Sequence, residues 1–215
     1  MSLVKQRVLV TGATGFVGKA LTYKLRSAGY SVVAAVRREP AVLGLAVGSV
    51  KVDDISAKTD WQLALNKIDV LIHCAARAHI MNDSVADPLT EFRQVNTAGT
   101  LNLARQAAEA GVRRFVFISS IGVNGTGNTK PFFEGDKVNP QEPYAISKLE
   151  AEQGLLALAE ESGMDVVIIR PPLVYGINAP GNFASLLKWM KTGVPLPFGA
   201  IHNQRSLVAL DNLVD

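Results

Sequence analysis

Short runs of apolar residues recur along the chain and alternate with longer stretches in which apolar positions have a helical spacing. Each run is nearly continuous instead of alternating with polar residues, which is typical of strands buried on both faces of a parallel sheet. The predicted strands are residues 8–10, 32–36, 50–52, 70–72, 115–118 and 166–169. The predicted helices are residues 18–28, 88–110 and 143–162. Strands joined by helical crossovers predict an α/β fold with a doubly wound parallel sheet of the Rossmann type.

Composition narrows the class of protein. Apolar residues make up 48% of the 215 and the mean hydropathy is +0.18, which favours a packed globular fold over disorder. The net charge is +3, and the scattered basic residues form no stripe for nucleic acid, so we expect no nucleic-acid partner, and the mild positive charge fits an anionic small molecule equally well. The lone cysteine, Cys74, predicts a buried side chain in a reducing compartment.

Targeting and metal-binding signals are not apparent. No apolar run is long enough to span a membrane, and a strand begins too near the N-terminus to leave room for a leader peptide. No Cys/His spacing fits a metal site. We therefore expect a cytoplasmic protein that binds no metal.

The first predicted strand leads into a glycine-rich turn with GxxGxxG spacing, and a helix follows. Such glycines allow a tight turn, a close approach of the backbone to a pyrophosphate, and close packing of helix on strand. The helix N-terminus adds free N–H groups and a partial positive charge. A plain turn is the alternative, but the position inside a βαβ unit favours a dinucleotide site. The candidate cofactor-binding residues here are Gly12, Thr14, Gly15, Phe16, Val17 and Gly18.

The residues after the second and third strands bear on the choice of dinucleotide. Val36 stands where NAD-preferring sites place an acidic residue, and Arg37 follows it. Because an arginine can bind a 2′-phosphate bidentately, Arg37 favours NADP over NAD, with a solvated basic loop as the alternative. After the third strand, the sequence Asp53-Asp54-Ile55 could offer a carboxylate to the adenine amino group or simply cap the next helix.

Tyr144 and Lys148 are four residues apart at the start of a predicted helix, so their side chains share one helix face. A tyrosine phenol has a pKa of about 10, and a nearby ammonium would lower that pKa and make the phenol a usable base. Ser120 follows the strand that precedes this helix. Ligands of parallel α/β sheets bind beyond the carboxyl ends of the strands, so we expect Ser120, Tyr144 and the glycine loop to meet in one crevice.

After residue 170 the pattern changes, because prolines interrupt it at positions 171, 172, 180, 195 and 197. One helix is predicted at about residues 183–191, and another begins near residue 209. We therefore expect a dinucleotide-binding Rossmann domain over residues 1–172. Residues 173–215 are expected to be the start of a small substrate-binding lobe that is truncated here.

Together these motifs resemble the extended short-chain dehydrogenase/reductases, and within them the NAD(P)-dependent nucleotide-sugar epimerase/reductase family of UDP-glucose 4-epimerase-like proteins. The resemblance covers the whole chain. It rests on the glycine loop, Asp53-Asp54-Ile55, residues 73–76 (HCAA), residues 96–100 (NTAGT), Ser119-Ser120, Tyr144 with Lys148, and residues 170–176 (RPPLVYG).

The resemblance implies a role for each matching residue. Ser120 would contact the substrate hydroxyl, Tyr144 would be the acid/base, and Lys148 would bind the nicotinamide ribose. Further residues expected to line or support the dinucleotide are Cys74, Ala75, Ala76, Asn96 and Pro171. Further residues expected to contact the substrate are Asn124, Asn182 and Arg205, the last through a phosphate unless it is simply a surface arginine.

Two departures from the family pattern leave the reaction open. Leu173 stands where sugar-nucleotide epimerases often carry an asparagine, and the acidic residue after the second strand is missing. One hypothesis is an epimerase acting at C4 of a UDP-hexose or UDP-N-acetylhexosamine. A second is an NADPH-dependent reductase of a UDP-4-keto-6-deoxy sugar. A third is a non-catalytic NADP-binding sensor, against which Tyr144 and Lys148 argue. The resemblance also implies a homodimer built on helices 88–110 and 143–162.

Overall fold

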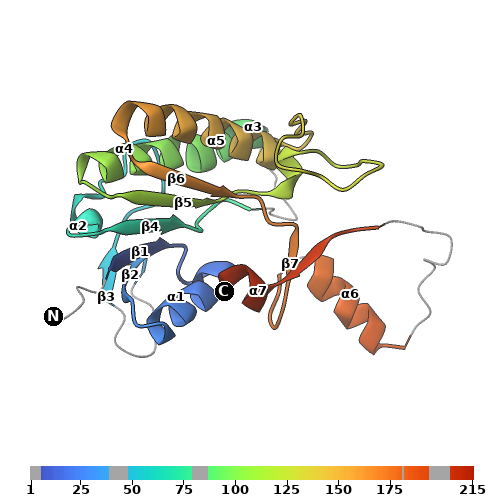
Figure 1. Ribbon diagram of the computed structural model, residues 1–215. Helices are drawn as coiled ribbons and strands as arrows, with labels where there is room; N and C mark the ends of the chain where they lie inside the picture. The colour runs from blue at the N-terminus through green and yellow to red at the C-terminus, as the bar shows by residue number, and fades with distance from the viewer. Residues whose placement is uncertain (1–5, 39–47, 79–86, 181, 194–203) are drawn as a thin grey trace.

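The computed structural model describes residues 6–38, 48–78, 87–180, 182–193 and 204–215. Its centre is a six-stranded parallel sheet in the order β3-β2-β1-β4-β5-β6 (Figure 1). The strands are β1 (Arg7–Thr11), β2 (Ser31–Val36), β3 (Gly48–Lys51), β4 (Val70–His73), β5 (Arg114–Ile118) and β6 (Asp165–Ile169). The strand order reverses between β1 and β4, so the predicted doubly wound α/β fold is confirmed.

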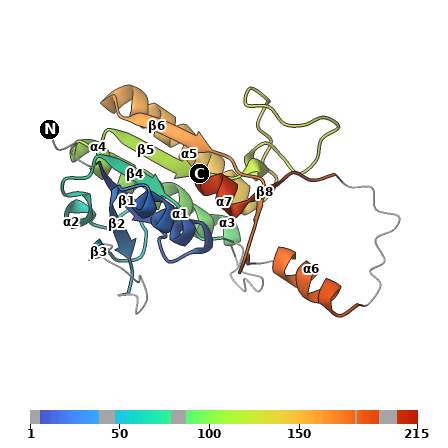
Figure 2. The ribbon, with the colours of Figure 1, turned by 60° about the horizontal axis from the view of Figure 1, so that its bottom comes forward.

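Helices cover both faces of this sheet. They are α1 (Phe16–Ser27), α2 (Gln62–Leu65), α3 (Pro88–Phe92), the π-helix η1 (Arg93–Gly99), α4 (Thr100–Glu109), the 3-10 helix η2 (Ile121–Val123) and α5 (Pro143–Ser162). Figures 1 and 2 show α1 on one side of the sheet and α4 and α5 on the other. Gly163 ends α5 in the left-handed conformation, with φ of 74°, which is the usual role of a glycine after a helix.

Each face of the sheet has its own core, because successive strand residues point to opposite sides. Val8 and Val10 of β1 pack with Leu21 on the α1 side. Leu9, between them, belongs to the larger core on the side of α4 and α5. The largest buried apolar side chains of that core are Trp61, Leu65, Leu71, Leu103, Phe115, Phe117 and Leu155. Burying a leucine or phenylalanine contributes about 1.5–3 kcal/mol, and most of the large buried apolar side chains lie on this face.

The predicted helix over residues 88–110 is a continuous helical segment that contains the π-helix η1 in its middle. Gly99 is the last residue of this π-helix, and its backbone lies close to the loop after β3. A Cβ on Gly99 would lie 2.5 Å from Ile55 Cγ2. π-Helical turns inside helices are rare and often accompany functional sites.

The C-terminal part adds a small second sheet, which the sequence pattern did not predict. Strands β7 (Leu173–Tyr175) and β8 (Leu207–Ala209) pair in parallel, and α7 (Leu210–Val214) then packs against α1. Helix α6 (Asn182–Lys191) stands away from the main sheet in both ribbon views. The domain boundary at residue 172 stays a prediction.

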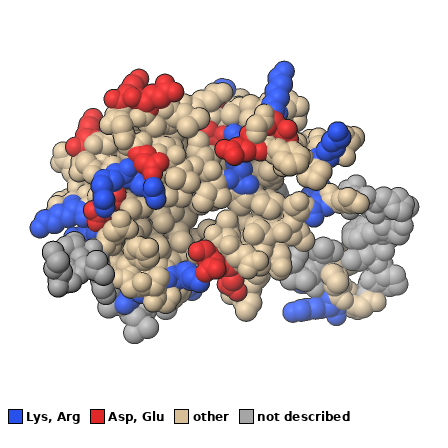
Figure 3. Space-filling view, viewed as in Figure 1, with Lys and Arg blue, Asp and Glu red and all other residues tan. Residues whose placement is uncertain are grey.

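The surface carries no large charged region on the face seen in Figure 3, where basic and acidic side chains form small separate groups. None of the helices in the described part of the chain is both long and apolar enough to cross a membrane.

Candidate active site

The glycine loop connects β1 to α1, and close contacts require two of its glycines. Gly12 has a φ of 67°, and a Cβ on it would lie 2.7 Å from the backbone nitrogen of Ala75. A Cβ on Gly18 would lie 2.7 Å from the carbonyl carbon of Gly12. Gly15 is the N-cap of α1, and the first turn of that helix contains no acidic residue. The loop therefore leaves the positive end of α1 open to an anion such as a pyrophosphate.

The end of β4 packs against this loop through a buried histidine. The two ring nitrogens of His73 lie 2.7 Å from Thr11 Oγ1 and 3.0 Å from Thr100 Oγ1. Burial, and then the charge of Lys148, lower the pKa of His73 to about 3, so the ring is neutral. Burial raises the pKa of the neighbouring Cys74 thiol to about 12. His73 thus joins β1 to α4 and is not poised for acid–base chemistry at neutral pH.

Arg37 and Asp54, the candidates for the adenosine end, form an ion pair with each other. Arg37 Nη1 lies 2.8 Å from Asp54 Oδ1, and the two side chains are 73% and 82% exposed. Such exposed pairs contribute about 0–1 kcal/mol to stability. Asp53 beside them is exposed, whereas Ile55 is turned toward Gly99 and the core. The guanidinium predicted to bind a 2′-phosphate therefore already has a carboxylate partner.

Tyr144 and Lys148 lie one turn apart at the beginning of α5, as predicted. Lys148 is buried, and its Nζ lies 3.9 Å from the centre of the Phe117 ring in β5. The ring of Tyr144 meets Phe92 edge-on, with 5.9 Å between the ring centres. Helix α5 therefore holds its lysine against the carboxyl-terminal part of β5.

Burial dominates the electrostatics of this pair. It raises the pKa of the Tyr144 phenol above its ordinary value. It lowers the pKa of Lys148 to about 7, although the Glu152 carboxylate acts in the opposite direction. The pKa of Tyr144 is therefore raised and not lowered as predicted, because burial disfavours the charged phenolate.

Ser120 is the N-cap residue of η2 and lies close to α5. Its Oγ accepts a hydrogen bond of 3.1 Å from the backbone N–H of Gly122. A Cβ on Gly122 would be only 3.4 Å from Ala145, the residue after Tyr144. The backbone of η2 is also bonded to the carbonyl oxygen of Pro171, at 3.1 Å. The structure thus brings Ser120 and Pro171 to the first turn of α5.

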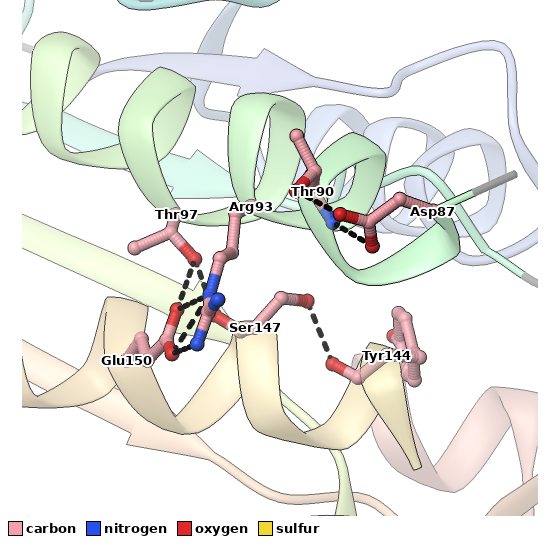
Figure 4. Close-up of polar contacts among 7 residues, drawn as sticks. All are labelled: Asp87, Thr90, Arg93, Thr97, Tyr144, Ser147 and Glu150. Carbon is pink, nitrogen blue, oxygen red and sulfur yellow. Dashed lines mark hydrogen bonds and ion pairs between the residues drawn. The ribbon is translucent and has the colours of Figure 1, made fainter.

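Asn96 connects the loop after β4 to α5. Its Oδ1 accepts a bond of 2.8 Å from the Arg77 N–H, and its Nδ2 donates to the Arg77 carbonyl at 3.0 Å and to Ser147 Oγ at 3.1 Å. Ser147 in turn donates to the carbonyl oxygen of Tyr144 at 2.7 Å (Figure 4). Both ends of the Asn96 amide are therefore bonded within the protein, and its role toward the dinucleotide stays a prediction.

A buried polar network behind these residues was missed by the sequence analysis. The Glu152 carboxylate accepts hydrogen bonds from the Ser119 hydroxyl and from the Arg170 guanidinium. Arg170 Nη1 also donates to Asn124 Oδ1 at 3.2 Å. The position of Glu152, four residues after Lys148, was the available signal, because that spacing returns a side chain to the same helix face.

The remaining candidate residues are less constrained. Ala75 and Ala76 follow β4 beside the glycine loop and are partly buried. Arg205 is exposed and precedes β8. Asn182 is the first residue of α6, and the structure describes its backbone but not its side chain. Within the described ranges, no group of three or more His, Cys, Asp or Glu side chains is arranged to hold a metal ion.

Comparison with known proteins identifies the family. The sequence profile described as the NAD dependent epimerase/dehydratase family matches residues 8–215. The chain belongs to this family. It is 51% identical to a UDP-glucose 4-epimerase of Vibrio cholerae, over 97% of this chain and 64% of that protein. It is 34% identical to a dihydroflavonol 4-reductase of Zea mays, over 98% of this chain and 65% of that protein. The chain thus spans slightly less than two thirds of the length of these relatives.

Solved structures of family members share the fold. MoeE5 in complex with UDP-glucose and NAD is similar with a TM-score of 0.82 and 29% identity, over 97% of this chain and 69% of that one. The UDP-glucose 4-epimerase of Thermotoga maritima with UDP-glucose gives 0.79 and 26%, over 97% and 71%. The UDP-glucuronic acid 4-epimerase of Bacillus cereus in complex with NAD gives 0.83 and 26%, over 97% and 71%. NAD is thus named as a ligand of MoeE5 and of the Bacillus cereus enzyme.

Proposed function

We propose that the protein is an NAD-dependent nucleotide-sugar 4-epimerase acting on a UDP-hexose or UDP-N-acetylhexosamine. The observation that carries the proposal is that Lys148 is buried one turn from Tyr144, on a helix whose first turn lies against Ser120. The 51% identity with a UDP-glucose 4-epimerase supports the same reaction for this chain. Inversion of configuration at C4 of the sugar requires the protein to transfer the proton of the C4 hydroxyl and to orient the sugar. Tyr144, Lys148 and Ser120 are residues of the kinds that do this.

In this proposal Tyr144 accepts the proton of the C4 hydroxyl and later returns it. Its raised pKa keeps the phenol protonated, so it is ready to return a proton to a sugar oxygen. To accept one, it needs the charged form of Lys148 nearby, since an ammonium favours the phenolate. Ser120 Oγ accepts from the Gly122 N–H, which leaves its own O–H free to donate to the same sugar oxygen.

The chain's residues fit a dinucleotide. When bound, NAD would accept a hydride from C4 of the sugar and then return it. The glycine loop would hold the pyrophosphate against the open end of α1. Lys148 would bind the nicotinamide ribose, and Cys74, Ala75, Ala76 and Pro171 would line the site.

NAD rather than NADP is proposed because Asp54 already engages Arg37. The NAD named in two similar structures supports the same choice. Fluorescence titration with NADH and NADPH tests it. We expect tighter binding of NADH, and we expect Asp54→Asn to shift the preference toward NADPH. Tighter binding of NADPH by the parent protein would reject the choice.

The substrate contacts proposed for Asn124, Asn182 and Arg205 extend the site toward the C-terminal lobe. Asn124 is the best supported of the three, because it is held by Arg170 at the end of η2. A homodimer through the helical segments 88–110 and 143–162 and a cytoplasmic location complete the proposal.

A net reduction is the second candidate. The 34% identity with a dihydroflavonol 4-reductase favours it, as does Val36 in place of an acidic residue, with Arg37 directly after it. The same Tyr144 would then only donate its proton. Epimerisation and reduction differ in whether the dinucleotide is consumed.

Product analysis separates the two. The full-length protein is incubated with UDP-glucose, with UDP-N-acetylglucosamine, and with NADPH plus UDP-4-keto-6-deoxy sugar, and the products are identified by NMR. The proposal predicts C4 epimers without net change in dinucleotide absorbance. Stoichiometric NADPH oxidation with the keto sugar alone would favour the reductase.

A further inference from the structure

A buried ion pair lies behind the candidate catalytic residues. Glu152 is 1% exposed, and its carboxylate faces Arg170 of the segment after β6. Arg170 Nε lies 3.0 and 3.1 Å from the two carboxylate oxygens, and its Nη2 lies 2.5 Å from one of them. The hydroxyl of Ser119 donates to the same carboxylate. Such a pair is costly to desolvate and is often no better for stability than apolar packing, so its placement calls for another explanation.

The groups joined by this pair belong to three separate parts of the site. Ser119 directly precedes Ser120 at the end of β5, and Arg170 directly precedes Pro171 after β6. Glu152 follows Lys148 by one helical turn. A single carboxylate therefore connects the ends of β5 and β6 to the helix that carries Tyr144.

The network also fixes an amide at the end of η2. Arg170 Nη1 donates to Asn124 Oδ1 at 3.2 Å, and Asn124 is only 5% exposed. A guanidinium can only donate, so the Asn124 oxygen must point toward it. The Asn124 NH₂ is then the end left to donate to an acceptor oxygen of a ligand.

We propose that Glu152 and Arg170 are positioning residues. Their ion pair fixes the positions of Ser120 and Asn124 relative to Tyr144 and Lys148 on α5. The inference rests on the proposed function for its kinetic effect. Its structural claim, that the ion pair fixes η2, can be tested by a measurement that needs no enzymatic activity.

The test uses two variants of the full-length protein and a matched control. Glu152→Gln keeps the shape of the side chain and removes its charge, and Arg170→Lys keeps the charge and removes the planar fork. The control is Glu150→Gln. Glu150 also pairs with an arginine, Arg93, with Nη2 at 2.6 Å, but this pair is partly exposed and joins α5 to η1 (Figure 4).

Both network variants are expected to lower kcat about 10²-fold, as small displacements of reacting groups do, with a smaller change in KM. Amide hydrogen exchange in residues 121–124 is expected to become about 10-fold faster, because opening of η2 becomes easier. Glu150→Gln should stay within about two-fold of the parent in both measurements, as surface substitutions usually do.

The outcomes separate this proposal from the function it rests on. Unchanged kcat and unchanged exchange in a folded Arg170→Lys or Glu152→Gln would overturn the positioning role. If the parent protein epimerises no UDP-sugar, the proposed function fails, and the exchange of residues 121–124 alone decides whether the pair positions η2. If Glu152→Gln does not fold, Arg170→Lys carries the test.

Discussion

His73 ties β1, β4 and α4 together through two threonine hydroxyls, and its burial makes a prediction about pH. The pKa is about 3 in the folded protein and 6.5 in the reference state. Between these values the unfolded chain binds the extra proton, so the free energy of unfolding falls as the pH falls through this window. The slope from this group is at most about 1.4 kcal/mol per pH unit.

The variant His73→Gln is expected to lose this contribution. Denaturant unfolding of parent and variant between about pH 7 and pH 4 gives the two slopes, and other titrating groups cancel in their difference. Identical slopes would contradict a neutral, buried His73.

Gly18 makes a second prediction at the residue scale. A Cβ there would run into the Gly12 carbonyl group, which is backbone and cannot move away cheaply. We expect Gly18→Ala to destabilise the fold by about 1–3 kcal/mol and to weaken NADH binding, because the loop must open. Gly135→Ala is the control, since a Cβ on Gly135 meets nothing within 4 Å. Equal NADH affinity in both variants would show that the loop tolerates a side chain.

At the scale of elements, the π-helix η1 places Asn96 between Arg77 and Ser147. Asn96 is 1% exposed, and Asn96→Ala would leave the backbone groups of Arg77 without this partner. We expect a loss of about 1–3 kcal/mol in the free energy of unfolding. The exposed Gln153→Ala on α5 should change it by less than about 0.5 kcal/mol. A loss for Asn96→Ala as small as that of the control would contradict the supporting role.

Elements with strong periodicity could be predicted, and irregular ones could not. The strands around the apolar runs and the helix α5 follow from spacing alone. The π-helix leaves no signature, because the spacing of apolar residues over 88–110 fits one continuous helix. Strands β7 and β8 are three residues each and far apart in sequence, so their pairing depends on tertiary structure.

The same limit applies to the site. Tyr144 and Lys148 could be found from a spacing, and Ser120 from the end of a strand. Glu152 could have been placed on the inward face of α5 from its position four residues after Lys148, but its pairing with Arg170 depends on tertiary structure. The raised pKa of Tyr144 was likewise beyond prediction, because it depends on the burial of the side chain.

For the whole molecule, helices α4 and α5 form one layer on the sheet, and this layer is the proposed dimer face. Leu156 on α5 is 51% exposed, and an apolar side chain of that exposure is suited to an interface. Leu156→Glu is expected to convert a dimer into a monomer, because it would bury a charge on association. Light scattering after size-exclusion chromatography measures the mass of both proteins. A parent protein that is monomeric would reject the dimer.

The central claim is that Tyr144 performs proton transfer at a dinucleotide site, and one substitution tests it most directly. Tyr144→Phe removes only the phenolic oxygen, so kcat of the full-length protein on its UDP-sugar is expected to fall by about 10²- to 10⁴-fold. NADH affinity should be retained, and the exposed Tyr30→Phe should match the parent in both measurements. Turnover by Tyr144→Phe equal to that of the parent would contradict the account.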